Sequence, residues 1–304
     1  MGNNYGVGAL IIMYIDKMKY RYMKKSLWIV LMGVVMLAGC GSHRQASADY
    51  SFVSFNIRLG SDWSRTQDSS NYWDFRKEAV LAMIAQESPD AMGMQEVLPG
   101  QLHFLDSALS GYQRIGVGRE DGKEEGECMA VFFKKDRFEL VKSHTYWLSE
   151  TPDSVSMGWD AACFRTVTMA LLRDKESQQQ LLYMNTHLDH VSATARAESM
   201  KLLTRLATEW IGEEVPVIIG GDMNTSADDT IFDNLLQKGF FKCRDAAPIT
   251  DNEMTFNGFG KTEPIQIDHY FGRNIEVKEF HTLNGDYGVP YISDHYPIKM
   301  VFHI

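Results

Sequence analysis

The 304-residue sequence predicts a four-layer α/β sandwich, in which two packed and mostly antiparallel β-sheets are flanked by helices. Strand-like segments dominate, and the helices come singly between groups of strands. The strict alternation of strand and helix that is typical of a doubly wound parallel sheet does not occur. Hydrophobic residues make up 44% of the chain, which is enough for a substantial core. We expect this core within one domain over residues 50–304.

Residues 1–40 are interpreted as a signal peptide and kept apart from the fold. Residues 23–25 (Met-Lys-Lys) are basic, residues 27–37 are an apolar run too short to span a bilayer, and residues 37–40 (Leu-Ala-Gly-Cys) resemble the bacterial lipobox. That resemblance implies a lipid on Cys40, a tether over residues 41–49, and an exported, membrane-tethered lipoprotein at the periplasmic face or cell surface. The residues before Met23 are interpreted as an upstream extension. An uncleaved single-pass anchor is the alternative.

The charge of the remaining chain argues against one class of partner. Without residues 1–40 the chain carries 25 Lys and Arg against 39 Asp and Glu, which gives a formal charge of −14. Proteins that bind duplex nucleic acid through its phosphates present a basic surface instead. A nucleotide-sized site stays open, because a bound divalent cation offsets local negative charge.

Apolar spacing and helix breakers predict the elements of the first half. A strand over 50–57 alternates in polarity, a polar loop covers 58–72, and Asp74 is expected to cap a helix over 75–87 that stops before Pro89. A short buried strand over 91–95 delivers Glu96. Pro99 begins a helix that ends at Gly111. Further strands are expected near 113–117, 128–133, 138–146, 164–172 and 180–186.

In the second half, a helix over 193–211 has apolar residues at helical spacing. The apolar run 216–219 is a buried strand that stops at Gly220-Gly221, a pair suited to a tight turn and to a close approach of backbone to ligand. Residues 226–229 resemble a capping box for a helix that runs to about residue 238. Strands near 265–272, 276–281 and 298–303 close the chain.

Polar side chains stand at the ends of the predicted strands, where ligands and catalytic groups gather in open sheets. Carboxylate and amide oxygens are the ligands that Mg²⁺ prefers, and this set supplies them. The residues concerned are Asn56, Glu96, His187, Asp222, Asn224, Asp268, Asp294 and His295.

The order of these motifs resembles the endonuclease/exonuclease/phosphatase superfamily, which has the deoxyribonuclease I-like fold. The resemblance spans residues 50–304 and favours a bacterial secreted lipoprotein branch, with a weaker similarity to nocturnin-like deadenylases. The segments that carry it are Asn56-Ile57, Gln95-Glu96, Gly126-Glu127, Phe164-Arg165, 185–188 (Asn-Thr-His-Leu), 220–224 (Gly-Gly-Asp-Met-Asn), 267–270 (Ile-Asp-His-Tyr) and 293–297 (Ser-Asp-His-Tyr-Pro).

The resemblance implies a Mg²⁺-dependent hydrolase that acts on phosphoester bonds. Asn56 and Glu96 would hold Mg²⁺, with Mn²⁺ as an alternative cofactor, and Asp294 would lie close to the ion. Asp222 would orient or deprotonate the attacking water, and Asn224 would donate a hydrogen bond to a phosphate oxygen. In-line attack at phosphorus needs such a positioned water, and it needs positive charge on the phosphate oxygens.

The histidines would assist on the two sides of the phosphate. His295 would serve as a base or as a phosphate donor, oriented by Asp268, because acid–histidine pairs raise the imidazole pKa. His187 would face it as a donor or acid, supported by Glu127. Arg165 would bind phosphate, and Arg196 either reaches a phosphate or pairs with an acid.

Three alternative hypotheses compete with the hypothesis that the protein is a phosphoesterase acting on small or exposed phosphoesters. A calcineurin-like phosphatase would need Gly-Asn-His and Gly-His-x-His clusters, and neither occurs in the sequence. A catalytically silent, lipid-tethered binding protein would lack the catalytic groups. An extracellular nuclease of the same fold is the nearest alternative.

Nucleotides, sugar phosphates and phospholipid head groups are the expected substrate classes, and a monomer is the expected oligomeric state.

Overall fold

The computed structural model describes residues 49–60 and 71–304. The predicted signal peptide, its lipobox with Cys40, and residues 41–48 of the predicted tether lie outside this part. Among the described helices, none is long and apolar enough to cross a membrane.

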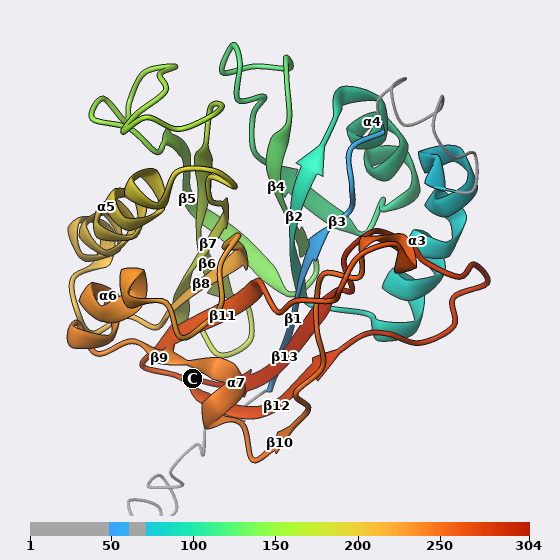
Figure 1. The fold of residues 1–304 in the computed structure, drawn as a ribbon. Coiled ribbons are helices and arrows are strands. Elements are labelled where there is room, and N and C mark those ends of the chain that lie inside the picture. The colour runs from blue at the N-terminus through green and yellow to red at the C-terminus, as the bar shows by residue number, and fades with distance from the viewer. Residues whose placement is uncertain (1–48, 61–70) are drawn as a thin grey trace, which may run out of the picture. The chain divides into compact units, whose positions relative to one another are not determined.

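Two β-sheets pack face to face and confirm the predicted fold class (Figure 1). The seven-stranded sheet A runs in the order β10 (Ile249–Thr250), β12 (Glu276–Thr282), β13 (Ile298–His303), β1 (Tyr50–Asn56), β2 (Ala91–Val97), β4 (Cys128–Lys134) and β3 (Tyr112–Ile115). The six-stranded sheet B runs in the order β5 (Phe138–Trp147), β6 (Thr166–Asp174), β7 (Gln180–His187), β8 (Val217–Asp222), β11 (Asp268–Arg273) and β9 (Phe241–Lys242).

Parallel pairing within these sheets is limited to β1–β2, β7–β8 and β10–β12, and every other neighbouring pair is antiparallel. Two of the three parallel pairs lie at the centre of their sheets. Because parallel strands end at the same edge, β1 and β2 deliver their last residues side by side, and so do β7 and β8. These two edges are where the predicted site residues lie.

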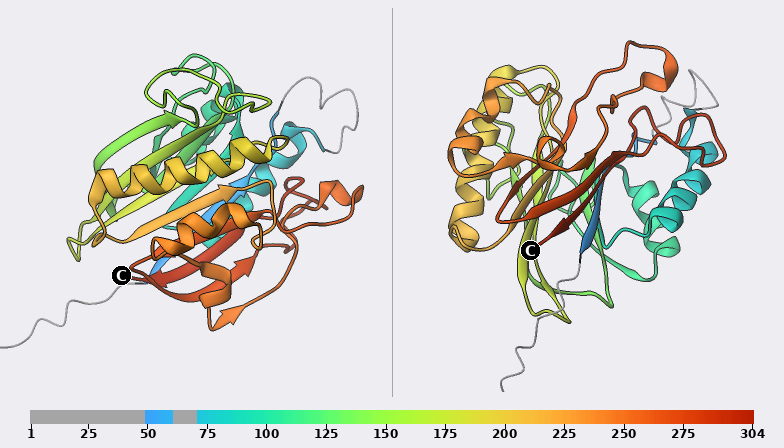
Figure 2. Two further views of the ribbon diagram at one scale, coloured as in Figure 1. Left: turned by 60° about the vertical axis from the view of Figure 1, so that its left-hand side comes forward. Right: turned by 90° about the horizontal axis from the view of Figure 1, so that it is seen from below.

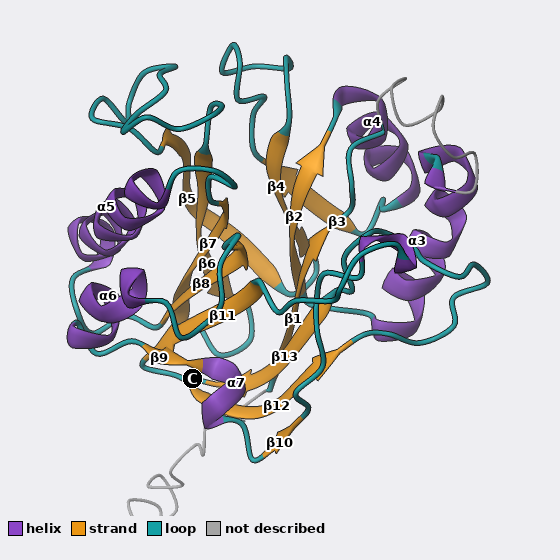
Figure 3. Ribbon diagram, in the orientation of Figure 1, coloured by secondary structure: helices purple, strands orange, loops and turns teal. Residues whose placement is uncertain are grey.

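Helices cover the outer face of each sheet (Figures 2 and 3). α3 (Trp73–Glu87) and α4 (Pro99–Ala108) lie on sheet A, while α5 (Ala193–Ile211) and α6 (Asp233–Gln237) lie on sheet B. Three apolar clusters separate the four layers. One lies between the sheets and contains Phe52, Tyr183 and Tyr270; one lies under α5, and one lies under α3 and α4. Burial of apolar surface at these three interfaces is the main stabilising contribution.

Several local expectations are corrected. Asp74 lies inside the first turn of α3, where it accepts from Lys77 Nζ at 2.9 Å, and Tyr72 holds the N-cap position. The predicted long helix after residue 226 is replaced by the one-turn helix η2 (Thr230–Phe232) and by α6, and Asp229 caps the pair by accepting from Ile231 N. Residues 241–260 add three elements that were not expected: β9, α7 (Cys243–Ala246) and β10, followed by the short turn η3 (Gly258–Gly260).

Candidate active site

Sheet B places three of the predicted residues in one row. His187 at the end of β7 lies directly opposite Asp222 at the end of β8, and Asp222 lies directly opposite Asp268 at the start of β11. All three side chains are buried. Strand pairing alone therefore brings together groups that are 35 and 46 residues apart in the chain.

Gly221 sets the backbone just before Asp222. Strand β8 continues through both Gly220 and Gly221, so the predicted turn at this pair is wrong. The close approach is confirmed, because a Cβ on Gly221 would lie 1.8 Å from the carbonyl oxygen of Thr186. Its φ of +147° is a value that L residues rarely adopt. Glycine thus allows β7 and β8 to approach closely just before the row formed by His187, Asp222 and Asp268.

Sheet A contributes Asn56 and Glu96 from its two parallel strands. Asn56 ends β1, and Glu96 lies in β2 with a φ of +61°, at an irregularity in the β2–β4 pairing between Met94 and Val97. A bulge of this kind redirects a side chain. Here Glu96 Oε1 accepts from Asn56 Nδ2 at 3.0 Å, and Oε2 accepts from Leu59 N at 3.0 Å.

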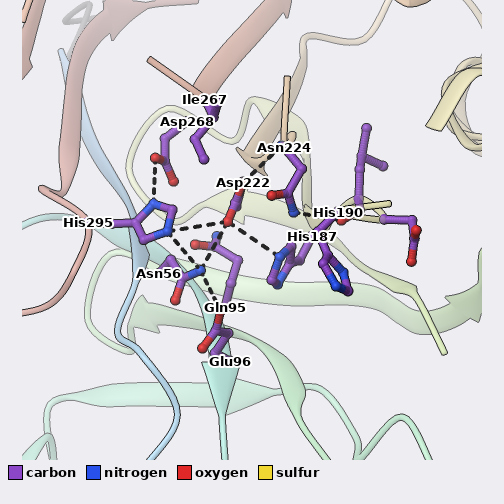
Figure 4. A network of polar contacts seen from close by, with 12 residues as sticks. Asn56, Gln95, Glu96, His187, His190, Asp222, Asn224, Ile267, Asp268 and His295 are labelled. Atoms are coloured by element: carbon purple, nitrogen blue, oxygen red, sulfur yellow. Dashed lines mark hydrogen bonds and ion pairs between the residues drawn. The ribbon is translucent and has the colours of Figure 1, made fainter. Parts of the chain in front are cut away.

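The two sheets meet at Asp222 through a continuous polar network (Figure 4). Asn56 Nδ2 donates to Asp222 Oδ2 at 3.0 Å, in addition to its bond with Glu96. The same Asp222 oxygen lies 3.4 Å from His187 Nε2 and 3.6 Å from His295 Nε2. On its other side, His295 Nδ1 lies 2.8 Å from Asp268 Oδ2. The pairing of His295 with Asp268 is the acid–histidine arrangement that the sequence predicts.

Charge and burial set different protonation for the members of this network. Burial alone would lower the pKa of His295, but Asp268 and Asp222 outweigh it and raise the pKa to about 10. Burial raises the pKa of Asp222 to about 7, although the charge of His295 opposes that shift. At neutral pH His295 is therefore a cation that donates from both ring nitrogens, and Asp222 is poised to exchange a proton.

His187 has the opposite character. Burial, together with the charges of Arg165 and Arg119, lowers its pKa well below the usual value, so the ring is neutral at pH 7. Its Nδ1 is buried without a hydrogen-bond partner. Glu127 was expected to support this ring, but its carboxylate instead binds Arg119 through two bonds of 2.8 Å. The predicted support of His187 by Glu127 is thus replaced by an Arg119–Glu127 ion pair.

These side chains open into a pocket of about 510 Å³. Its volume alone does not single it out, since hollows of about 560 and 590 Å³ lie elsewhere on the described surface. The chemistry of its lining distinguishes this pocket, because basic and acidic groups converge there beside the apolar side chains of Phe256 and Ile265. The basic lining residues are Arg58, Arg119, Arg165, His187 and His190; the acidic ones are Glu96, Glu127, Asp222 and Asp294.

The predicted phosphate-binding residues Arg165 and Asn224 both line the pocket, and each is also bonded to other groups of the protein. Arg165 lines the pocket, where its Nη2 lies 2.8 Å from His190 Nδ1 and its Nε lies 3.3 Å from Asp189 Oδ2. Asn224 also lines it, with a φ of +50°, but its Nδ2 donates to the carbonyl oxygen of Leu188 at 2.9 Å. That bond uses one hydrogen of the amide, and the second hydrogen can donate to a phosphate.

Arg196 does not reach the pocket, and its predicted contact with substrate is not supported. Its Nη1 donates to the carbonyl oxygen of Asp189 at 2.8 Å, from the first turn of α5. The carboxylate of Asp189 accepts from Val191 N and Ser192 N through one oxygen and from Ala162 N through the other. Arg196 and Asp189 therefore fix the loop that carries His190.

The predicted metal ligands form an oxygen-rich cluster at the pocket, which Glu96 and Asp294 line. Glu96, Asp294 and Asn56 are buried, and their side-chain oxygens match the preference of Mg²⁺ for carboxylate and amide ligands. Burial raises the pKa of Asp294, whereas Arg58, Asn56 and the backbone amide of Leu59 outweigh burial at Glu96 and lower its pKa. The donor set fits a hard divalent cation.

Two other groups of potential ligand atoms lie within 4.8 Å of one another among the described residues. One is Asp222, Asp268 and His295, which is fully buried and forms the network above. The other is Cys163, Asp189 and His190, where the guanidinium of Arg165 already occupies the space between Asp189 and His190. Both groups already hold a cation that would repel a divalent ion, Arg165 at the second group and the protonated His295 at the first.

Sequence reasoning missed Arg58 and Arg119. Arg58 was assigned to a polar loop, although it follows Asn56 by only two positions and therefore lies at the same strand end. Extending the strand-end rule by two residues would have found it. Arg119 has no comparable signal, because it lies in the connection between β3 and β4, and its place in the pocket depends on pairing with Glu127.

Comparison with known proteins agrees with this geometry. The model of the endonuclease/exonuclease/phosphatase family matches residues 53–295. An endonuclease/exonuclease/phosphatase from Bacteroides vulgatus is 35% identical with a TM-score of 0.79, covering 84% of this chain and 98% of that one. A mannosyl-6-phosphatase from Bacteroides thetaiotaomicron is 32% identical with a TM-score of 0.77, covering 83% and 99%.

A curated relative, the uncharacterized protein L388 of Acanthamoeba polyphaga mimivirus, is 25% identical over 256 residues, which cover 78% of this chain and 95% of that protein. The family match spans most of the described domain and includes Asn56, Glu96, His187, Asp222 and His295. The chain belongs to the endonuclease/exonuclease/phosphatase family, whose members are hydrolases that act on phosphoester bonds.

Proposed function

We propose that the chain is a divalent-metal-dependent phosphoesterase that hydrolyses small phosphoesters by in-line attack of an activated water. The observation that carries this proposal is the buried Asp268–His295–Asp222 network at the pocket, with His295 2.8 Å from Asp268 and 3.6 Å from Asp222. A carboxylate with a pKa near 7 beside a cationic imidazole combines a proton acceptor with a stabiliser of anionic charge.

Within this proposal, Asp222 accepts the proton of the attacking water. His295 is protonated at neutral pH, so it donates to the phosphate and does not act as the base. Asp268 positions His295 by binding Nδ1, which leaves Nε2 facing Asp222 and the pocket. His187 is neutral and donates a hydrogen bond across the phosphate, while Arg165 adds positive charge.

Glu96, Asp294 and Asn56 would hold the divalent cation, Mg²⁺ or Mn²⁺. The ion would supply positive charge to the phosphate oxygens, which is the usual contribution of such a cation to phosphoryl transfer. The network joins this cluster to the base, because Asn56 Nδ2 donates to both Glu96 and Asp222 at 3.0 Å. Asn56 therefore fixes the position of Asp222 relative to the metal ligands.

A phosphorylated sugar is the substrate class that we propose. A structural neighbour with 32% identity over almost its full length is named a mannosyl-6-phosphatase. The pocket volume of about 510 Å³ suits a small molecule. The formal net charge of the whole chain is −10, so long-range electrostatics do not favour a polyanionic nucleic acid. A nuclease of the same fold is the competing function.

A substrate panel with the purified protein tests this proposal. The panel contains mannose 6-phosphate, bis(p-nitrophenyl) phosphate and a single-stranded DNA oligonucleotide, each assayed with Mg²⁺ and with EDTA. We expect the highest kcat/KM for mannose 6-phosphate, with activity lost in EDTA. Faster cleavage of the oligonucleotide would support the nuclease, and undiminished hydrolysis in EDTA would contradict the metal dependence.

A further inference from the structure

Arg58 contacts all three residues that we assign to the metal. Its Nη1 lies 3.5 Å from Glu96 Oε2, and its Nε lies 3.5 Å from Asp294 Oδ2. Its backbone N donates to Asn56 Oδ1 at 3.0 Å. Arg58 alone therefore contacts side-chain oxygens of all three residues that would bind a divalent cation.

The backbone of Arg58 is held firmly, while its side chain keeps access to the pocket. Its φ of +58° is unusual for a residue with a side chain. The carbonyl oxygen accepts from Gln101 Nε2 at 3.0 Å and from Arg76 Nη2 at 3.3 Å. The side chain is 28% exposed and lines the pocket. Its guanidinium can change position without movement of the chain that carries it.

A divalent cation and the guanidinium cannot share these carboxylates at close range. Glu96 and Asp294 are 8% and 7% exposed, so charges that meet there are only weakly screened by water. The contacts of 3.5 Å are longer than those of a strong charge-assisted hydrogen bond, which is about 2.8 Å. By contrast, Arg119 binds Glu127 at 2.8 Å through both nitrogens. Arg58 is the more weakly held of the two guanidinium groups.

We infer that Arg58 is an internal counter-ion, which partly offsets the charge of Glu96 and Asp294 until a divalent cation binds these carboxylates, and that its guanidinium then turns towards the substrate phosphate. This inference rests on the proposed function. Arg58 thereby competes with the metal in the free protein and adds positive charge beside the phosphate in the loaded protein. This movement of the Arg58 side chain couples metal binding to formation of the positively charged surface that binds the substrate phosphate.

Calorimetric titration with Mn²⁺ in the absence of substrate tests the competition. Arg58→Ala removes the competitor, so we expect its Mn²⁺ Kd to fall by about tenfold or more. Arg119→Ala is the matched control, because it removes an equal charge from the same pocket without touching Glu96 or Asp294. We expect its Kd to stay within about threefold of wild type.

The outcomes separate this inference from the proposed function. If wild-type protein binds no Mn²⁺ at millimolar concentration, the metal site itself is wrong. If wild type binds Mn²⁺ but Arg58→Ala and Arg119→Ala change the Kd equally, Arg58 is no specific competitor and the inference is overturned. Arg58→Met removes the charge and keeps most of the side-chain length, so it replaces Arg58→Ala if that variant does not fold, and an unchanged Kd in Arg58→Met would overturn the inference.

Two further readouts address the free and loaded states. Without metal, Arg58→Ala should lower the Tm, because Glu96 and Asp294 lose their counter-ion; saturating Mn²⁺ should remove most of that difference. At saturating Mn²⁺, its kcat/KM for mannose 6-phosphate should fall about tenfold or more, since a charged phosphate contact is lost. An equal Tm loss with and without metal, or an unchanged kcat/KM, would contradict this movement of the Arg58 side chain.

Discussion

Three buried histidines show how neighbours decide the chemistry of a residue. His295 lies against Asp268 and near Asp222, and these carboxylates raise its pKa to about 10. His187 lies near Arg165 and Arg119, and burial together with their charges keeps it neutral. Burial dominates at His269, whose pKa is lowered to about 4 even though its Nε2 lies 2.9 Å from the carbonyl oxygen of Thr225.

His269 should make the fold sensitive to acid. Its folded pKa of about 4 lies below the unfolded value near 6.5, so its contribution to stability is full above pH 6.5 and is lost as the pH falls towards 4. The expected loss is about 3 kcal/mol. His269→Gln can keep the bond to Thr225 without titrating. Urea unfolding at pH 7.5 and pH 4.5 should show a smaller drop in unfolding free energy for the variant, and equal drops would refute the assignment.

At the residue scale, the sequence predicts which residues belong to the site better than it predicts which partners they contact. The types at Asn56, Glu96, Asp222 and His295 follow from the chemistry of phosphoryl transfer and from the family motifs. Their partners do not, because partners depend on side-chain rotamers and on distant loops. Glu127 illustrates this limit: its pairing with Arg119 depends on how the β3–β4 connection folds back, and no local pattern encodes that.

At the scale of elements, the site depends on how closely β7 and β8 approach. The pairing places His187 opposite Asp222, and Gly221 removes the side chain that would collide with Thr186. The sequence predicts the strand and its close approach from the apolar run and the glycine pair. It misplaces the strand end, because a glycine pair is compatible with a turn as well as with a tightly packed strand.

Gly221→Ala should be strongly destabilising. Its Cβ would lie 1.8 Å from Thr186 O, at a φ of +147°, so the two central strands must separate. We expect the unfolding free energy in urea to fall by at least about 2 kcal/mol. Gly100→Ala in α4 is the control, because nothing lies within 4 Å of its Cβ and alanine favours a helix. Similar stabilities of both variants would show that β7 and β8 tolerate a side chain there.

At the scale of the whole domain, the site exists only where both sheets end together. Asn56 and Glu96 come from sheet A, whereas His187, Asp222 and Asp268 come from sheet B. A polar bridge inside the core supports that alignment: Gln95 Nε2 on β2 donates to Asn185 Oδ1 on β7 at 2.7 Å. Asn185 Nδ2 in turn donates to the carbonyl oxygens of Met94 and Ala130.

The layered architecture is predictable from the order of strands and helices, since each element must bury one apolar face. The strand order across each sheet is not, because pairing such as β1 with β13 joins the two ends of the domain without a local signal. The short elements between residues 241 and 260 were missed for a related reason: β9 and β10 have two residues each and depend on their neighbours in the sheets.

The central claim is that Asp222, where the two sheets meet, activates the attacking water. Mg²⁺-dependent hydrolysis of bis(p-nitrophenyl) phosphate by wild type and Asp222→Asn tests it most directly, with Arg205→Ala on the exposed face of α5 as a control for handling. The account predicts that Asp222→Asn folds with a Tm close to wild type and loses about 10²- to 10⁴-fold in kcat, while Arg205→Ala keeps the wild-type rate. A folded Asp222→Asn protein that hydrolyses the substrate at the wild-type rate would contradict the account.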